Sequence, residues 1–182
     1  WVLVQGDTTS AMVASLLAFY QGVKVGHIEA GLRTHNLQQP FPEELNRRIT
    51  DIVSTLYFSP TARTRSNLLR EGVPGDRILI TGNTVIDALL LMRERVREKH
   101  GLLAPYHGML DGKRLILVTS HRRENFGEPF ANICIALREL ATRYHDVHFI
   151  FPVHYNPNVR EPAHAALSGC KSITLIYPVD YE

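Results

Sequence analysis

The 182-residue sequence has few cysteines and no long hydrophobic run. Its two cysteines, Cys134 and Cys170, form no CxxC pair, so the sequence offers neither a disulfide framework nor a thiolate zinc site. Two isolated thiols are typical of a reducing compartment, and we expect a cytoplasmic protein. Because no stretch approaches about 18 apolar residues, we expect no membrane span, and the first residues show no signal-peptide pattern.

A charge excess and phosphate-binding glycine loops are also missing. The chain carries 20 Lys and Arg against 18 Asp and Glu, a net charge of +2, which argues against a general nucleic-acid binder. No GxGxxG or GxxxxGK[ST] sequence occurs, so nothing indicates a bound dinucleotide or ATP. The nine histidines form no HxH or HExxH, and we predict neither a metal site nor a cofactor.

Seven short runs rich in β-branched and aromatic residues predict strands. Most are apolar throughout, as in parallel strands that are covered on both faces. The runs are Val2–Val4, Val23–Ile28, Leu56–Phe58, Ile78–Ile80, Leu115–Val118, Val147–Ile150 and Ile173–Ile176. Because helical patterns separate the runs along most of the chain, the sequence predicts an α/β fold with parallel sheets.

Apolar residues at helical spacing predict buried helix stripes between the strands. The stripes are Met12, Leu16, Phe19 and Tyr20; Leu45, Ile49, Ile52 and Val53; and Phe130, Ile133, Cys134, Leu137, Leu140 and Ala141. Helices are also expected over 60–71 and 84–99, and Gly22 and Gly72 are expected C-terminal stops. Pro42 suits a first helical position, and Glu43–Arg47 and Glu44–Arg48 have the spacing of ion pairs.

Polar side chains follow five of the seven predicted strands. Since ligands of open α/β sheets bind at the carboxyl ends of the strands, these residues are candidates for a site. They include Asp7, Glu29, His121 and His154. Carboxylates beside histidine and arginine suggest acid–base chemistry on an anionic substrate.

Each of these residues also has a purely structural interpretation. Asp7 could cap the helix that begins near Thr8, and Glu43 could be a favourable charge at a helix N-terminus. His121 could lie in a surface turn, and His154 could be a loop histidine. Only their common location at one sheet edge favours function.

Six motifs in order then carry a resemblance to a known family. They are Gly6-Asp7-Thr8-Thr9, His27 to Thr34, Pro42 to Arg47, Thr81 to Asp87, Ser120 to Gly127 and Pro152 to Arg160. With these motifs the chain resembles the non-hydrolysing UDP-N-acetylglucosamine 2-epimerases. The resemblance implies two Rossmann-like domains of GT-B type, both incomplete here. It places 1–83 in the first domain, 84–112 in a connecting helix and linker, and 113–182 in the second.

The resemblance also implies an isomerase that interconverts UDP-N-acetylglucosamine and UDP-N-acetylmannosamine without a cofactor. In such a reaction UDP is eliminated with the C2 proton and adds back after inversion at C2. The implied partners are UDP-N-acetylglucosamine and UDP, with no nucleic acid or membrane, in a homodimer when the protein is full length. A role in cell-envelope polysaccharide synthesis is the corresponding expectation.

Family positions map onto particular residues of this sequence. Asp7, Glu29 and Glu43 match catalytic carboxylates, and His121 matches a histidine that contacts the nucleotide sugar. The substrate-binding set is Asp7, Glu29, Arg47, His121, Arg122 and His154. Glu43, Arg122 and His154 also match a second, regulatory ligand site, and Arg47 could orient Glu43 or contact the ligand.

Three alternatives stay open at this point. The hydrolysing relatives release UDP and N-acetylmannosamine, a GT-B glycosyltransferase requires an acceptor, and a binding module would have lost turnover. The resembling proteins are about twice as long and contain nucleotide-binding segments that are absent here. We therefore expect these 182 residues alone to be weakly active or inactive, and their sheets to expose edges or faces.

Overall fold

The computed structural model describes residues 1–99, 104–110 and 112–180 and contains two parallel sheets. The chain divides into two compact units, Trp1–Leu91 (unit 1) and Met92–Glu182 (unit 2). The α/β class predicted from the sequence is thereby confirmed. No helix of the described part is long and apolar enough to cross a membrane.

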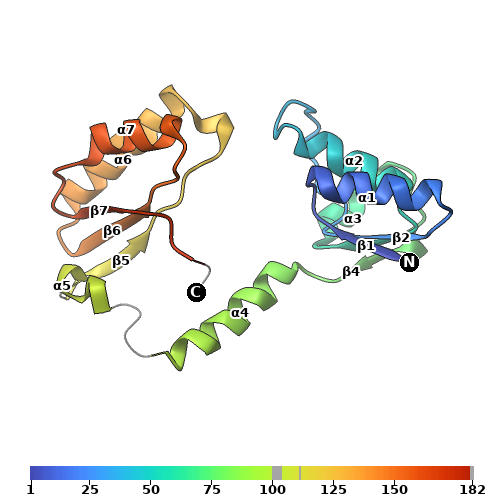
Figure 1. Ribbon diagram of the computed structural model, residues 1–182, viewed down its shortest axis with the longest axis horizontal. Helices are drawn as coiled ribbons and strands as arrows, with labels where there is room; N and C mark the ends of the chain where they lie inside the picture. Colours follow the sequence, from blue (N-terminus) through green and yellow to red (C-terminus); the bar gives the residue numbers. More distant parts are fainter. Residues whose placement is uncertain (100–103, 111, 181–182) are drawn as a thin grey trace. The chain divides into compact units, whose positions relative to one another are not determined.

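Unit 1 contains four strands and the helices that connect them (Figure 1). Its elements are β1 (Val2–Gln5), α1 (Thr9–Tyr20), β2 (Val25–Ile28), α2 (Glu43–Val53), β3 (Leu56–Ser59), α3 (Ala62–Arg70), the 3-10 turn η1 (Gly75–Arg77), β4 (Ile78–Ile80) and the first part of α4 (Thr84–Arg97). The strands lie in the order β1-β2-β3-β4. Their register aligns Val4 with His27 and His27 with Tyr57, which brings the carboxyl ends of β1 and β2 to one edge.

Unit 2 repeats this architecture with three parallel strands in the order β5-β6-β7. Its elements are η2 (Ala104–Tyr106), α5 (His107–Leu110), β5 (Arg114–Leu117), η3 (Arg123–Asn125), α6 (Glu128–Arg143), β6 (Val147–Pro152), α7 (Pro157–Leu167) and β7 (Ile173–Ile176). All seven predicted strands are present. Residues 100–103 and 111 of the predicted linker lie outside the described residues.

Helix ends follow the local chemistry. Thr8 is the N-cap of α1, where its side chain accepts a hydrogen bond from Ala11 N, and α3 opens with a Thr61–Thr64 capping box. Gly22 and Gly72 follow α1 and α3 with positive φ, as predicted. Pro42 occupies the N-cap of α2 instead of the predicted first helical position.

The apolar core of unit 2 lies between β6 and the two helices α6 and α7. Phe130, Cys134 and Leu137 of α6 pack with Phe149 and Phe151 of β6, which confirms these three positions of the predicted stripe. Leu140 belongs to the same predicted stripe but is 41% exposed.

The predicted stripes of α1 and α2 are wrong. Helix α1 buries the small residues Ala11, Ser15 and Ala18 and leaves Tyr20 exposed. Helix α2 buries Glu44, Asn46, Thr50 and Asp51, whereas Ile52 is 80% exposed. Because α2 faces its own unit with polar side chains, the interior of unit 1 contains a hydrogen-bonded polar layer, described below.

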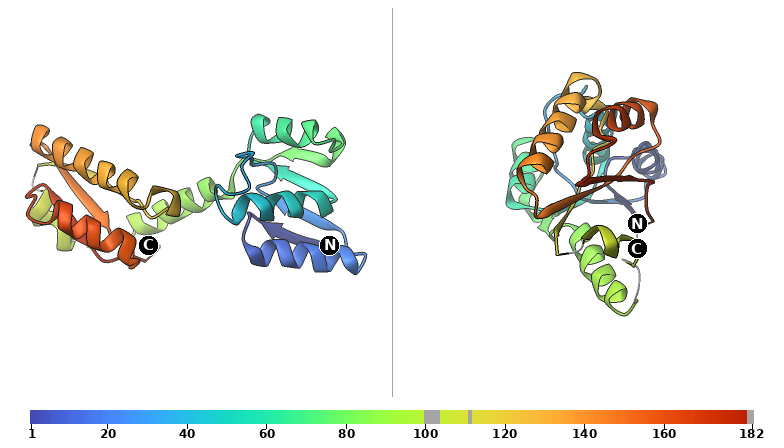
Figure 2. Two further views of the ribbon diagram at one scale, coloured as in Figure 1. Left: turned by 90° about the horizontal axis from the view of Figure 1, so that it is seen from above. Right: turned by 90° about the vertical axis from the view of Figure 1, so that its left-hand side faces the viewer.

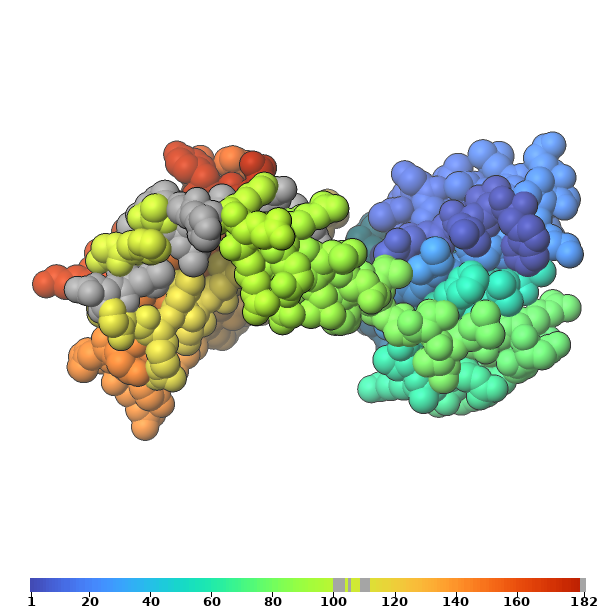
Figure 3. Space-filling view, turned by 90° about the horizontal axis from the view of Figure 1, so that it is seen from below, coloured from blue at the N-terminus to red at the C-terminus, as the bar shows by residue number. Residues whose placement is uncertain are grey.

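Helices α1, α2 and α3 cover the same side of the sheet in unit 1, as Figures 1 and 2 show. Figure 3 looks at the opposite side, where atoms of β1 (dark blue) and β4 (green) reach the surface. Leu3 of β1 is 61% exposed and Leu79 of β4 is 46% exposed. The expectation of an exposed sheet face is therefore confirmed for unit 1.

Candidate functional site

Two predicted carboxylates meet at the edge formed by β1 and β2. Asp7 follows Gly6, whose positive φ of 71° turns the chain out of β1. Glu29 follows β2 with a φ of 73°, an uncommon conformation for a residue with a side chain. A Cβ atom added to Gly6 would lie 3.4 Å from Glu29 Oε2, so the Glu29 carboxylate lies over the backbone that carries Asp7.

Asp7 forms an ion pair with Arg47 of α2. The capping interpretation of Asp7 is wrong, because Thr8 caps α1. Asn46 donates a hydrogen bond from Nδ2 to the Asp7 carbonyl at 2.9 Å, so α2 contacts both the backbone and the side chain of Asp7. Arg47 also lies 3.6 Å from the buried carboxylate of Glu44.

The predicted pairs along α2 do not form in the described part of the chain. Arg47 instead contacts the carboxylates of Asp7 and Glu44. Glu43 opens α2 one turn before Arg47, is half-buried, and has no side-chain hydrogen bond or ion pair within the described residues. The prediction that Arg47 orients Glu43 is therefore wrong, and the Glu44–Arg48 pair is also absent.

Glu29 is held by an amide rather than by a cation. Asn83, which follows β4, donates from Nδ2 to Glu29 Oε1 at 3.0 Å. The backbone N–H groups of Glu29 and Ala30 both donate to Phe58 O, at 3.0 and 3.1 Å. These contacts fix Glu29 on both sides while its carboxylate stays partly accessible.

A chain of charged and titratable groups, buried apart from the exposed Glu71, lies beneath these carboxylates. His27 contacts Gly6 O through Nε2 at 2.9 Å and Asp51 Oδ1 through Nδ1 at 2.6 Å. Asp51 Oδ2 accepts hydrogen bonds from Arg33 Nη2 at 2.7 Å and from Gly31 N at 3.3 Å. Glu71, at the end of α3, accepts two hydrogen bonds from Arg33, at 2.7 and 2.8 Å.

The electrostatics of this chain follow from burial and pairing. Burial alone would lower the pKa of Arg33, but the hydrogen bonds and charges of Glu71 and Asp51 outweigh it and raise that pKa. Burial, and secondarily the Asp51 charge, also raise the pKa of the Tyr57 hydroxyl, which donates to Asp51 O at 2.8 Å. Arg33 therefore stays charged beside Asp51 and Glu71.

Gly31 shows why the turn after β2 contains glycine. Its φ is 85°, and an added Cβ would collide with the Thr64 carbonyl oxygen of α3. The chain thus passes close to α3 before Arg33 reaches back to Asp51. Sequence reasoning quoted Gly31 and Arg33 as motif residues but missed Asp51 and Glu71, which match no spacing rule.

In unit 2 the predicted histidines come together, on a different sheet from Asp7 and Glu29, so the prediction of one common sheet edge is wrong. His121 follows β5 and His154 follows β6, and their rings stack with centroids 5.8 Å apart and an interplanar angle of 17°. Both are exposed, as is Arg122 next to His121. Two imidazoles and a guanidinium at one sheet edge form a surface that suits an anionic ligand.

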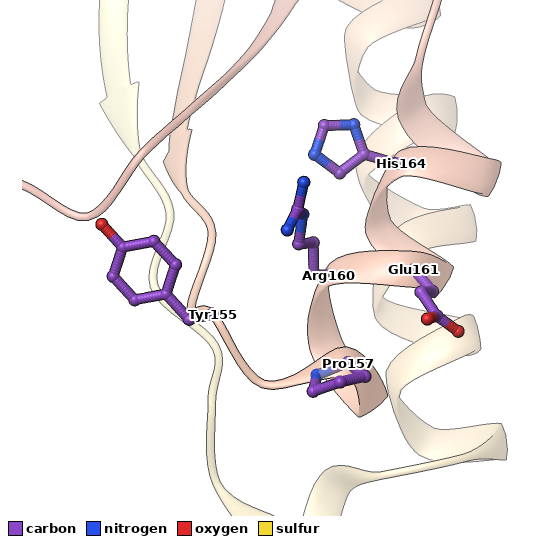
Figure 4. A pocket seen from close by; sticks show the side chains of 5 residues that line it. All are labelled: Tyr155, Pro157, Arg160, Glu161 and His164. Carbon is purple, nitrogen blue, oxygen red and sulfur yellow. The ribbon is translucent and has the colours of Figure 1, made fainter.

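A pocket of about 380 Å³ lies at the same edge of unit 2, beside the start of α7 (Figure 4). Tyr155, Arg160 and His164 line it together with Pro157 and Glu161, and Arg160 extends between Tyr155 and His164. An adjoining hollow adds Tyr177, whose ring lies 6.4 Å from that of Tyr155. Sequence reasoning singled out none of these side chains, although the Pro152 to Arg160 motif contains Tyr155 and Arg160. No group of three metal-ligating side chains occurs among residues that the structure describes.

Comparison with known proteins shows which family this chain is similar to. The family model described as UDP-N-acetylglucosamine 2-epimerase matches residues 1–182. The UDP-N-acetylglucosamine 2-epimerase of Escherichia coli K12 is 52% identical over 184 residues, which cover 99% of this chain and 49% of the relative. The enzyme of that name from Neisseria meningitidis serogroup A is 48% identical over 183 residues. The chain spans about half the length of the curated relatives it matches.

Solved structures agree with the sequence comparison. The crystal structure of a Neisseria meningitidis UDP-GlcNAc 2-epimerase bound to UDP-GlcNAc aligns with a TM-score of 0.88 and 46% identity, over 99% of this chain and 49% of that one. The Methanocaldococcus jannaschii enzyme in complex with UDP-GlcNAc and UDP aligns with a TM-score of 0.75 and 32% identity, over 99% and 50%. These neighbours have the GT-B fold. The chain therefore belongs to the UDP-N-acetylglucosamine 2-epimerase family.

Proposed function

We propose that this chain forms the catalytic part of an enzyme that interconverts UDP-N-acetylglucosamine and UDP-N-acetylmannosamine without net hydrolysis. Family membership supports the substrate and the epimerisation. The observation that carries the chemistry is the placement of Glu29 over Gly6, beside an Asp7 already paired with Arg47. This arrangement supplies two carboxylates in unlike environments at one sheet edge.

The reaction requires one base and one acid at C2 of the sugar. A base takes the C2 proton, the electrons of that C–H bond form the C1–C2 double bond, and the C1–O bond breaks to release UDP. UDP then adds back to C1 while a proton returns to the opposite face of C2. A pair of carboxylates with different neighbours can divide these tasks between them.

Glu29 is the better candidate for the base. Its carboxylate accepts a hydrogen bond from the neutral amide of Asn83, whereas that of Asp7 is neutralised by Arg47. A carboxylate that is held by a guanidinium is less free to approach C2 than one that is held by a neutral amide. Asp7 and Arg47 together would then contact the sugar or the departing diphosphate, and Glu43 is the further acid candidate on α2.

Unit 2 would hold the anionic part of the nucleotide sugar. His121 and Arg122 present positive or hydrogen-bonding groups at the carboxyl end of β5, and the stacked His154 supports the His121 ring. Arginine and imidazolium suit a diphosphate, whose charge grows as the C1–O bond breaks. The pocket at Tyr155 and Arg160 offers an aromatic face and a further cation beside these histidines.

Three further assignments belong to this proposal. Residues 1–83 and 113–182 form parts of two Rossmann-like domains joined by 84–112, supported by the two separate sheets. Glu43, Arg122 and His154 contact a second, regulatory nucleotide sugar. The whole enzyme is a homodimer, for which exposed apolar residues on α1 and α2, such as Leu17 and Ile52, offer a surface.

The test is proton exchange at C2 in deuterated water. The enzyme that contains this chain at full length is incubated with UDP-N-acetylglucosamine, and both epimers are analysed by mass spectrometry and NMR. Deuterium at C2 of both UDP-sugars, without free sugar, is the expected result. Accumulation of UDP and N-acetylmannosamine would instead show the hydrolysing reaction, and binding without exchange would show a module that has lost turnover.

A further inference from the structure

The ring of His27 faces two hydrogen-bond acceptors inside unit 1. The Gly6 carbonyl lies 2.9 Å from Nε2, and a carbonyl oxygen can only accept, so Nε2 carries a hydrogen. Asp51 Oδ1 lies 2.6 Å from Nδ1. His27 is 1% exposed, so water does not replace either partner.

The other contacts of Asp51 hold its carboxylate against the His27 ring. Its Oδ2 accepts from Arg33 Nη2 at 2.7 Å and from Gly31 N at 3.3 Å. Tyr57 from β3 donates to the backbone carbonyls of Asp51 and Ser54, and Glu71 from α3 faces Arg33. The ring is therefore held at both nitrogens, by the Asp51 carboxylate and by the Gly6 carbonyl.

The Gly6 carbonyl connects this buried ring with the site. Gly6 N donates to Ile28 O at 3.0 Å, so the peptide groups on both sides of Gly6 are tied to β2. Asp7 is the next residue along the chain, and the Glu29 carboxylate lies over Gly6. A change at His27 Nε2 therefore acts on the turn that sets the separation of the two carboxylates.

We infer that His27 is a positioning residue for the epimerisation: held in place by Asp51, it fixes the Gly6 carbonyl and thereby the placement of Asp7 against Glu29. The inference rests on the proposed function for its catalytic consequence, whereas the two contacts of the ring stand independently of it. His27 touches no reacting atom in this arrangement, and its effect passes through Gly6. A purely structural histidine would contribute stability only.

Two substitutions separate these roles because each keeps one of the two contacts. His27→Asn places an amide nitrogen near the position of Nδ1 and retains the Asp51 contact, while the Gly6 contact is lost. His27→Gln reaches the position of Nε2 and retains the Gly6 contact, while the Asp51 contact is lost. Both remove the imidazole ring, so their losses of stability serve as each other's control.

The experiment measures kcat and KM for C2 exchange by the full-length enzyme, with the folded fraction of each variant determined by urea unfolding. We expect His27→Asn to lower kcat about 10-fold to 100-fold with little change in KM, and His27→Gln to retain several times more activity. His145→Asn, at an exposed histidine, should behave like the wild type. Equal kcat values for the Asn and Gln variants at equal folded fraction would overturn the positioning role.

A spectroscopic measurement covers the case in which both variants fail to fold. In wild-type protein with 15N-labelled histidine, Nε2 of His27 should carry a proton that is hydrogen-bonded to the Gly6 carbonyl, and an Nε2 without a proton would contradict the inference. Failure of the proposed function has a different signature, since the wild-type enzyme itself would then show no C2 exchange.

Discussion

Arg47 binds Asp7 across the unit and not Glu43, its neighbour one turn earlier on α2. The two paired residues are 40 positions apart in the sequence, and they connect the end of β1 with the middle of α2. Through this pair α2 takes part in the site as well as in the packing of unit 1.

Substitution of Arg47 should therefore affect catalysis more than folding. Arg47→Ala frees the Asp7 carboxylate and removes a cation from the edge where the diphosphate departs, so we expect kcat for C2 exchange to fall about 100-fold. Arg48→Ala, at the exposed next position of the same helix, is the matched control and should retain wild-type kcat. Comparable losses in both variants would indicate a general defect of α2. Steady-state kinetics of the full-length enzyme makes the comparison.

Glu29→Gln should abolish proton exchange while it preserves binding. The amide is the same size as the carboxylate and still accepts from Asn83, but it cannot take the C2 proton. Loss of a general base costs about 10²-fold to 10⁴-fold in rate. Calorimetry with UDP-N-acetylglucosamine should give near wild-type affinity, and Glu139→Gln, an exposed residue of α6, should leave both quantities unchanged. Retention of exchange in Glu29→Gln would assign the base to Asp7 or Glu43.

The strands were predictable from the sequence because each is a short apolar run. Helix α7 was not predicted, because Pro157 and Pro162 both lie in it and a proline usually indicates that a helix is absent or ends. Pro157 stands at the first turn, where its missing N–H costs nothing, and Val159, Ala163 and Leu167 bury one face. Sequence patterns take account of the two prolines, but they do not show that this face of α7 is buried.

The stripes of α1 and α2 failed for a related reason. Periodicity alone assigned the apolar face to the core, whereas α2 buries Glu44 and Asp51 because their partners come from distant segments. Thr34 N and His35 N donate to Glu44, each at 3.1 Å, and Arg33 donates to Asp51. Such pairings join residues 9 to 18 positions apart, and no spacing rule for a helix or strand reveals them.

The residues of the candidate site also fall into those that the sequence predicts and those that it does not. Asp7, Glu29 and His121 were predictable because each follows a strand and belongs to a recognisable motif. Asp51 and Glu71 were not, since an acidic residue late in a helix is common on protein surfaces. Their role emerges only when the turn around Gly31 carries Arg33 to both of them.

Removal of the buried carboxylate should destabilise unit 1 strongly. Asp51→Asn removes the carboxylate that the His27 ring and Arg33 share, and breaking a buried pair costs about 3–5 kcal/mol. Asp146→Asn removes an ion pair with Arg114 in which both side chains are well exposed, for which we expect about 1 kcal/mol or less. Urea unfolding measures both losses of unfolding free energy. It is followed through amide signals of unit 1 for Asp51→Asn and of unit 2 for Asp146→Asn. Similarly small losses of unfolding free energy in the two variants would contradict a stabilising role of the buried Asp51 contacts.

His148 should make the stability of unit 2 depend on pH. Its ring is buried in β6, with Nε2 2.8 Å from Thr174 Oγ1 and no hydrogen-bond partner at Nδ1 among the described residues. Burial, and secondarily the charge of Lys113, lower the pKa of His148 below 6.5. As the pH falls below this unfolded value, the unfolded chain binds a proton before the folded one does. Stability is therefore lost progressively until the pH reaches the lowered pKa of the folded state.

His148→Gln tests this linkage, because the amide nitrogen can still reach Thr174 but does not titrate. The variant should lose the His148 contribution to the fall in unfolding free energy between about pH 8 and pH 5, measured by urea unfolding followed through unit 2 signals. His145→Gln, at an exposed neighbour, should retain it. A direct NMR titration gives the second measurement: a pKa of 6.5 or higher for His148 would contradict the prediction, since the folded state would then bind the proton at least as readily as the unfolded chain.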